Sequence, residues 1–315
     1  MLLKLTALTI IASATSIVEL DPDLHPYEPT TGVSGTVTSM GSDTMNNLMT
    51  AWGDEFARFY PAVKVEVQGK GSSTAPTALI EGQALFGPMS RRMKPSESDK
   101  FLERFGYEPE LLRTGVDCLA VFVHRDCPID ELSLEQVEQV FSVTGPDMRW
   151  RDLGVTDPAW ANRPIALYGR NSASGTYGYF KDLGLGGNDF KASVKEQPGS
   201  SAVVQAIAED QYSMGYSGIG YRSPGVKALR LSVDGDESFE PSGENAYTGD
   251  YPLARFLYVY INHDPREELD PLRAEFIRVI YSREGQDAVL KYGYYPLSAE
   301  LADGELERLG LLQES

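Results

Sequence analysis

The stretch "RPIALYGRNSASGTYGYFKDLGL", residues 163–185, holds the local pattern that the rest of the chain repeats. It begins as an apolar strand, continues through small hydroxyl and glycine residues headed by Arg170, and ends in a helical segment. Small polar residues at the start of a helix can be simple capping residues. Next to an arginine they can also line an anion site, because a helix N-terminus offers free N–H donors and partial positive charge. Both interpretations remain open at this point.

The order of strand, Gly/Ser-rich loop and helix occurs twice more in the first hundred residues. A strand over 35–40 leads to "GSDT" and a helix with one apolar face, which we expect Ser42 or Asp43 to cap. The alternating strand "VKVEVQG" leads to "GKGSS" and a short helix, and the apolar strand "ALFGPMS" then ends at Ser90 and two arginines. This repetition predicts an α/β fold with mostly parallel strands, in which ligands bind beyond the carboxyl ends of the strands.

The remainder of the chain predicts a second unit and a return to the first. Strands are expected at "GVDCLAVFVHRD" and "SMGYSGIGY", and helices at "SLEQVEQVF" and "GSSAVVQAIAED". Near Tyr251 the pattern changes to the strand "ARFLYVYINHD" and one or two helices in "LRAEFIRVIYSREGQDAVLKYG". We therefore expect one lobe formed by residues 33–113 and 254–315, a second lobe formed by residues 116–250, and a hinge near residues 114 and 252.

Composition and charge restrict the classes of partner. The chain has 28 Lys and Arg against 46 Asp and Glu, a formal net charge of −18, which argues against nucleic acid or an acidic membrane surface as a partner. A small anion is still possible, because it responds to a local site. The three histidines lack zinc-protease spacing, and Cys118 and Cys127 form no metal motif. We expect two free thiols rather than a disulfide, no metal, no cofactor and no enzymatic activity.

The N-terminus resembles a secretory signal. "MLLKLTALTIIASATS" carries one early positive charge at Lys4, an apolar run too short to span a bilayer, and small residues at 12–14. We interpret residues 1–18 as a signal peptide, although a buried N-terminal helix would show a similar apolar run, and we expect a periplasmic or secreted protein.

Five motifs in this order carry a family resemblance. They are "GSDT", "GKGSS", "FGPMSRRM", "GRNSASGT" and "GYSGIGY". With this set the chain resembles the periplasmic phosphate-binding proteins of high-affinity phosphate ABC transporters, from about Gly35 to the last helix. The resemblance implies a two-lobed periplasmic-binding-protein-like fold with a ligand cleft between the lobes, inorganic phosphate as ligand, a membrane permease as partner and a monomeric state.

The resemblance also implies which residues contact the ligand. Arg170 would be the charged clamp, since a guanidinium matches two phosphate oxygens at once. The other implied contacts come from three of the motifs: Ser42, Asp43, Thr44, Ser72, Ser73, Ser174, Gly175 and Thr176.

One position departs from the family pattern. Many members carry an aspartate after the second helix, which accepts a hydrogen bond from the protonated oxygen of phosphate and so rejects sulfate, whereas this chain has Ser90 followed by Arg91. The site would then hold Arg91 as a second arginine, and Asp43 becomes the candidate acceptor. Asp43 could instead only cap the first helix, in which case another oxyanion is possible. A binding protein that feeds a sensor also fits these motifs, and a secreted phosphatase fits them less well.

Overall fold

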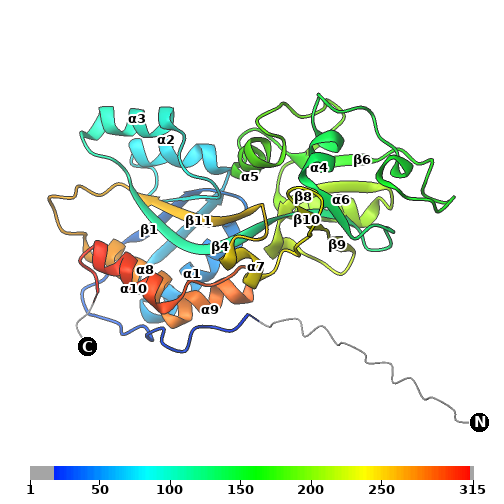
Figure 1. The fold of residues 1–315 in the computed structure, drawn as a ribbon. Helices are drawn as coiled ribbons and strands as arrows, with labels where there is room; N and C mark the ends of the chain where they lie inside the picture. The colour runs from blue at the N-terminus through cyan, green and yellow to red at the C-terminus, as the bar shows by residue number, and fades with distance from the viewer. Residues whose placement is uncertain (1–17, 313–315) are drawn as a thin grey trace, which may run out of the picture.

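The computed structural model describes residues 18–312, which fold into two α/β lobes side by side (Figure 1). Except for Val18, the expected signal peptide lies outside the described residues. Within the described part of the chain no helix combines the length and apolarity needed to cross a bilayer.

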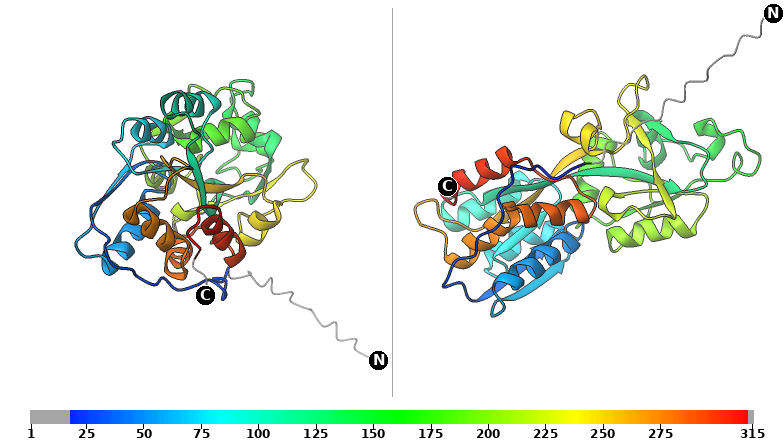
Figure 2. Two further views of the ribbon diagram at one scale, coloured as in Figure 1. Left: turned by 90° about the vertical axis from the view of Figure 1, so that its left-hand side faces the viewer. Right: turned by 90° about the horizontal axis from the view of Figure 1, so that it is seen from below.

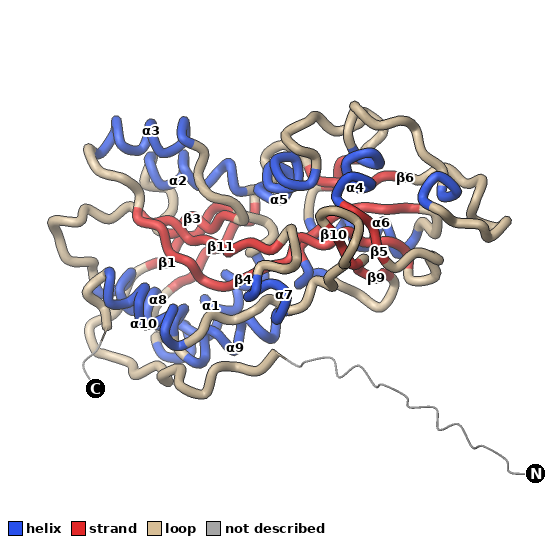
Figure 3. Tube along the Cα trace, viewed as in Figure 1, coloured by secondary structure: helices blue, strands red, loops and turns tan. Residues whose placement is uncertain are grey.

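The first lobe is a sheet covered by helices on both faces. Its strands β1 (Thr36–Gly41), β2 (Lys64–Gly69) and β3 (Phe86–Met89) are parallel, with β1 in the middle. Figure 3 shows α2 and α3 on one face and α1, α8, α9 and α10 on the other. The helices of this lobe are α1 (Asn46–Phe59), α2 (Ala75–Ile80), α3 (Pro95–Phe105), α8 (Pro271–Tyr281), α9 (Arg283–Lys291) and α10 (Ala299–Arg308).

The second lobe also has one strand paired parallel with two others. Its strand β6 (Ala166–Arg170) lies parallel to β7 (Lys195–Gln197) and β8 (Ser213–Gly218). A separate parallel pair is formed by β5 (Glu131–Ser133) and β10 (Arg230–Ser232). The other elements are α4 (Leu134–Phe141), α5 (Gly175–Tyr179), α6 (Ser200–Glu209), β9 (Val226–Ala228) and α7 (Gly243–Thr248).

One strand runs through both lobes. β4 (Glu110–His124) pairs antiparallel with β11 (Ala254–Ile261) as far as Cys118, and with β8 from Leu119 onward. The strand order is β2-β1-β3-β11-β4-β8-β6-β7, so a single hydrogen-bonded path crosses the molecule (Figure 2). β4 thus changes its partner from β11 to β8 between Cys118 and Leu119, inside a continuous strand. Parallel and antiparallel pairs together make the sheet mixed, and the α/β two-lobed prediction is confirmed.

Each lobe has its own hydrophobic core. Trp52, Phe56 and Phe276 lie in the first core, while Trp150 and Phe141 lie in the second. The apolar periodicity of the sequence produces this burial, since α1 turns its apolar side chains inward and leaves charged ones outside.

The two cysteines are buried free thiols, as expected. Burial raises the pKa of Cys127 to about 11, so this thiol is protonated near neutral pH.

Two details of the helices differ from expectation. The C-terminal region holds the two expected helices and also α10, and α3 and α7 were not predicted. The predicted cap of α1 is wrong: the N-cap position is Met45, without a side-chain hydrogen bond. Asp43 supplies only its backbone oxygen to Asn46 N (3.0 Å), because its carboxylate is used elsewhere.

Candidate functional site

The polar loops of the two lobes meet. Thr44, after β1, lies with its Oγ1 2.8 Å from Thr176 Oγ1, at the start of α5 in the other lobe. Ser73 N donates to Ala173 O across the same boundary (3.1 Å). Ser72 Oγ lies 3.3 Å from Ser90 Oγ. The structure thus brings together, from the carboxyl ends of β1, β2, β3 and β6, the loops that the sequence indicated.

The start of α5 is pressed against the first lobe. A Cβ atom at Gly175 would lie 2.2 Å from Ser72 Oγ and 2.6 Å from Ser90 Oγ, so only glycine fits there. Ser174 caps this helix through a hydrogen bond from Tyr177 N to its Oγ (3.4 Å). Simple capping therefore accounts for Ser174, while Gly175 allows close approach of the backbone.

Arg170 is a buried cation with incomplete partners. It is 2% exposed, its Nη1 donates to Ser200 Oγ (2.6 Å), and the same nitrogen lies 3.2 Å from Asp43 Oδ2. Its Nε has no partner. Burial lowers the pKa of Arg170 and Asp43 opposes this, yet an arginine remains charged in a protein. A buried charge with free donors is expected to attract an anion.

Asp43 bridges the lobes. Its Oδ2 accepts a hydrogen bond from Ser200 N (2.8 Å), the first residue of α6, and also faces Arg170. The carboxylate therefore sits at the N-terminus of α6 and not at that of α1, which corrects the expected cap. No hydrogen bond of the described residues ends on Asp43 Oδ1, so this oxygen remains available as an acceptor.

Arg91 lies beside the loops but faces its own lobe. Its two terminal nitrogens donate to the two oxygens of Glu97 (2.7 and 2.8 Å) and further to Ser73 Oγ (3.0 Å). Burial opposes ionisation of Glu97, but the hydrogen bonds from Arg91 and from Lys94 N together with the nearby positive charges outweigh it, and the pKa of Glu97 is lowered. Both terminal nitrogens of Arg91 are thus already occupied by the carboxylate of Glu97.

Three residues of the site were missed by sequence reasoning. Ser200 joins Arg170 and Asp43, while Arg255 donates to Thr176 Oγ1 (3.0 Å) and to Asp117 Oδ2 (2.7 Å). Asp117 and Arg255 interrupt the apolar strands "GVDCLAVFV" and "ARFLYVYI", and this interruption is the one signal that could have revealed them.

Within residues 18–312, five buried side-chain polar atoms have no hydrogen-bond partner. Three of them, Ser42 Oγ, Arg170 Nε and Arg255 Nη1, belong to residues at or next to these loops, while Ser39 lies inside β1 and Tyr281 at the end of α8. Because buried polar atoms are nearly always hydrogen-bonded, such a concentration marks a place suited to a polar ligand.

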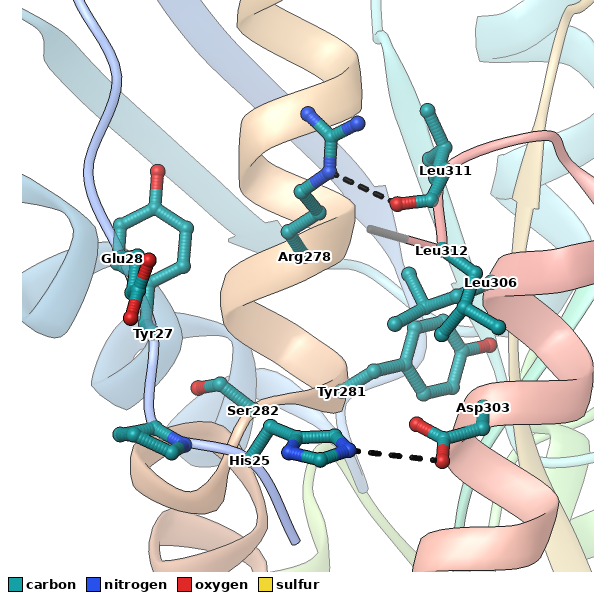
Figure 4. A pocket seen from close by; sticks show the side chains of 11 residues that line it. His25, Tyr27, Glu28, Arg278, Tyr281, Ser282, Asp303, Leu306, Leu311 and Leu312 are labelled. Carbon is teal, nitrogen blue, oxygen red and sulfur yellow. Dashed lines mark hydrogen bonds and ion pairs between the residues drawn. The ribbon is translucent and has the colours of Figure 1, made fainter. Parts of the chain in front are cut away.

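A separate cavity lies on the first lobe, between the N-terminal segment and helices α8 and α10 (Figure 4). It measures about 210 Å³ and is lined by residues that include His25, Arg278, Tyr281 and Asp303, none from the polar loops. Among the described residues no three His, Cys, Asp or Glu side chains are grouped as metal ligands. The loops between the lobes therefore form the candidate site.

Comparison with known proteins identifies the class first. A family model described as the PBP superfamily domain matches residues 27–284, most of the chain. Among solved structures, a phosphate ABC transporter substrate-binding protein with bound phosphate from Clostridium perfringens is similar, with a TM-score of 0.72 and 24% identity. It covers 84% of this chain and is itself covered completely. An ABC-type phosphate transport receptor from Vibrio cholerae has a TM-score of 0.66 at 22% identity, over 83% of this chain and all of its own. These two likenesses support the two-lobed fold.

Sequence relatives give the particular family. A phosphate-binding protein PstS from Pseudomonas aeruginosa is 46% identical over 318 residues, which is 98% of each chain. A phosphate-binding protein PstS from Bacillus subtilis is 27% identical, over 84% of this chain and 82% of its own. The chain belongs to the PstS family of the PBP superfamily.

Proposed function

We propose that this protein is an extracytoplasmic solute-binding protein that captures inorganic phosphate between its lobes and delivers it to an ABC transporter permease. The observation that carries the proposal is Arg170, a cation 2% exposed with a free Nε. Its Nη1 donates to Ser200 Oγ, which lies 3.4 Å from Thr44 Oγ1 of the other lobe. The relatives named above as phosphate-binding proteins support the choice of phosphate.

The donors of the site fit a compact oxyanion. Arg170 would supply the charge, and Thr44, Thr176 and Ser42 would supply hydroxyl groups, since Ser42 Oγ is buried without a partner. The glycine at 175 lets the backbone at the start of α5 come close. Such preorganised donors in a site shielded from water bind anions strongly.

Selectivity for phosphate would rest on Asp43. Near neutral pH phosphate carries a proton, whereas sulfate carries none, so an acceptor distinguishes them. Ser90 occupies the position at which many proteins of the phosphate-binding family have an aspartate. Asp43 Oδ1 makes none of the contacts that Oδ2 makes with Ser200 N and Arg170. We therefore assign the acceptor role to Oδ1. Arg91, closed on Glu97, is assigned a supporting role beside the ligand.

The remaining parts of the proposal concern export, partners and chemistry. Lys4 followed by an apolar run supports export to the periplasm or the exterior. The net charge of −18 disfavours nucleic acid as a partner. We propose a monomer without cofactor and without catalytic activity.

The direct experiment is calorimetric titration of protein stripped of ligand by dialysis against denaturant and refolded. Phosphate is expected to bind tightly, and sulfate at millimolar concentration is expected to give no heat of binding. Tight binding of sulfate or molybdate with no response to phosphate would assign the site to another oxyanion.

A second experiment separates a binding protein from a hydrolase. The protein is incubated with a generic phosphomonoester, with and without added divalent metal. No turnover above the uncatalysed rate is expected, and metal-dependent turnover that is lost in Arg170→Ala would contradict the proposal.

A third experiment tests movement of the lobes. The contacts between Asp43 and Arg170 and between Thr44 and Thr176 close the cleft, so a ligand must enter through a more open form. Small-angle scattering of ligand-stripped protein should show a smaller radius of gyration after saturation with phosphate. Superimposable curves would contradict hinge closure.

A further inference from the structure

A second buried ion pair lies at the point where the chain crosses between the lobes. Asp117 on β4 and Arg255 on β11 are partners in the antiparallel register, and their side chains are 0% and 1% exposed. Two nitrogens of Arg255, Nε and Nη2, donate to Asp117 Oδ2 at 3.0 and 2.7 Å. The first residue that pairs β4 with the second lobe, Leu119, is two positions further along.

This ion pair is connected to both sides of the crossing. Asp117 Oδ1 accepts a hydrogen bond from Ile219 N (3.0 Å), just after β8 of the second lobe. A Cβ atom at Gly218 would lie 3.0 Å from Asp117 Oδ2 and 3.1 Å from Thr44 Cγ2, so the carboxylate packs directly behind the polar loop of the first lobe. Asp117 is thus enclosed by strands and loops of both lobes.

Arg255 also holds the start of α5. Its Nη2 donates to Thr176 Oγ1 (3.0 Å), and the ring of Tyr179 covers its guanidinium at 5.3 Å. The Tyr179 hydroxyl donates to Ala254 O (2.5 Å), so two residues of α5 are fastened to the first two residues of β11. The guanidinium therefore links the hinge strands to a hydroxyl of the proposed ligand site.

The three hydroxyl groups of Thr44, Thr176 and Ser200 have three O–H protons but only two contacts with one another. Thr176 Oγ1 lies 2.8 Å from Thr44 Oγ1, which lies 3.4 Å from Ser200 Oγ. The outer two hydroxyls each accept from a guanidinium, Thr176 from Arg255 and Ser200 from Arg170. A guanidinium cannot accept in return. Two contacts use two of the three O–H protons, whichever way they point, so at least one O–H is left to donate to a ligand.

From this arrangement we infer that Arg255, held by Asp117, is a positioning residue for the anion. Because Thr176 Oγ1 accepts from Arg255, its own proton points away from Arg255, toward Thr44 Oγ1 or the ligand. The ion pair thereby couples β4 and β11, which join the lobes, to the ligand. The inference rests on the proposed phosphate-binding function and adds to it a residue pair outside the loops. Arg255 acts through Thr176 and is not assigned a direct contact with phosphate.

The test is a mutant cycle read by phosphate affinity. Removing only one charge would leave the other buried and could unfold the protein. The main variant is therefore Asp117→Asn with Arg255→Met, in which asparagine keeps an oxygen for Ile219 N. The charge-pair variant is prepared alone and together with Thr176→Val, and Thr176→Val is also prepared alone. Each protein is titrated with inorganic phosphate. Thermal unfolding verifies that each variant is folded.

The expected result is coupling. The charge-pair variant should bind phosphate at least ~10-fold more weakly, and Thr176→Val should weaken binding by a similar factor. The variant that combines both changes should bind phosphate no more than about twofold more weakly than the weaker-binding of the two separate variants, because both changes act on the same hydroxyl donor. Arg255→Lys, which keeps the charge but has no fork, should give an intermediate loss.

A matched control comes from the same strand. Arg113, also on β4, pairs with buried Glu305 of α10, and Glu305 keeps Arg308 as a second partner (2.6 Å) when Arg113 is replaced. Arg113→Met should therefore fold and leave phosphate affinity within about twofold. Two results would overturn the inference while leaving phosphate binding intact. One is a phosphate affinity of the charge-pair variant within about twofold of wild type. The other is a combined variant whose loss of affinity equals the product of the two separate losses. A wild-type protein that does not bind phosphate would instead overturn the proposed function.

Discussion

Two arginines lie beside serine-rich loops, one in each lobe, and they differ in the carboxylate that each one contacts. Arg91 gives both terminal nitrogens to Glu97, which is six residues away in the same lobe. Arg170 faces Asp43 from the other lobe through one nitrogen and keeps its Nε free. A carboxylate that accepts from both terminal nitrogens occupies the donors of a guanidinium. A carboxylate that contacts only one nitrogen leaves other donors free for a second anion. The role of an arginine in an anion-binding loop therefore depends on which carboxylate reaches it.

The largest effect is expected from Arg170→Ala. Truncation of a charge-assisted pair in a water-poor site costs about 2–5 kcal/mol, so phosphate should bind at least ~30-fold more weakly. Calorimetry measures the loss, and the circular dichroism spectrum should remain that of the wild type. Affinity retained within about threefold, under ~1 kcal/mol, would remove Arg170 from the role of clamp.

An intermediate effect is expected from Asp43→Asn. Asparagine keeps an oxygen for Ser200 N at the start of α6 but loses the negative charge that strengthens the hydrogen bond accepted from the phosphate O–H. A hydrogen bond to a charged group contributes about 1.5–3 kcal/mol, so the binding free energy of phosphate should become less favourable by that amount. Sulfate should begin to compete in a displacement titration. If phosphate affinity and sulfate exclusion both persist, Asp43 only caps α6 and discrimination comes from another residue.

The smallest effect on binding is expected from Arg91→Met. Its fork is already occupied by Glu97, so phosphate affinity should change by less than about threefold, under ~1 kcal/mol. Stability should fall instead, by about 1–3 kcal/mol, since Glu97 loses its hydrogen-bond donors. Chemical unfolding and calorimetry on the same preparation separate the two quantities. A loss of affinity as large as that of Arg170→Ala would make the two arginines equivalent and end the comparison.

Local patterns were sufficient for most of the fold. The alternating apolar residues of β2 and the apolar face of α1 have short-range periods that survive in a single sequence. The continuity of β4 through both lobes could not be predicted, because pairing with β11 and β8 is set by residues roughly a hundred or more positions away. α10 was missed because its short, largely polar sequence has little periodicity.

The candidate site was predictable where its residues are neighbours in the sequence and not where their partners are distant in the sequence. "GRNSASGT" shows Arg170 next to its donors, but no local feature shows that the carboxylate of Asp43 reaches α6 or that Glu97 closes on Arg91. These pairings depend on the folded arrangement of the loops and lobes. The same holds for Asp117 and Arg255, whose register exists only in the folded sheet.

The central claim is that phosphate binds between the lobes at Arg170 and Asp43, and its position in a crystal structure of the phosphate complex tests this most directly. The account predicts phosphate oxygens at about 2.7–3.0 Å from an Arg170 nitrogen and from the hydroxyls of Thr44 or Thr176, with one oxygen within hydrogen-bond distance of Asp43 Oδ1. A phosphate bound at Arg91 with the pair between Arg91 and Glu97 broken, or at a surface away from both lobes' loops, would contradict it.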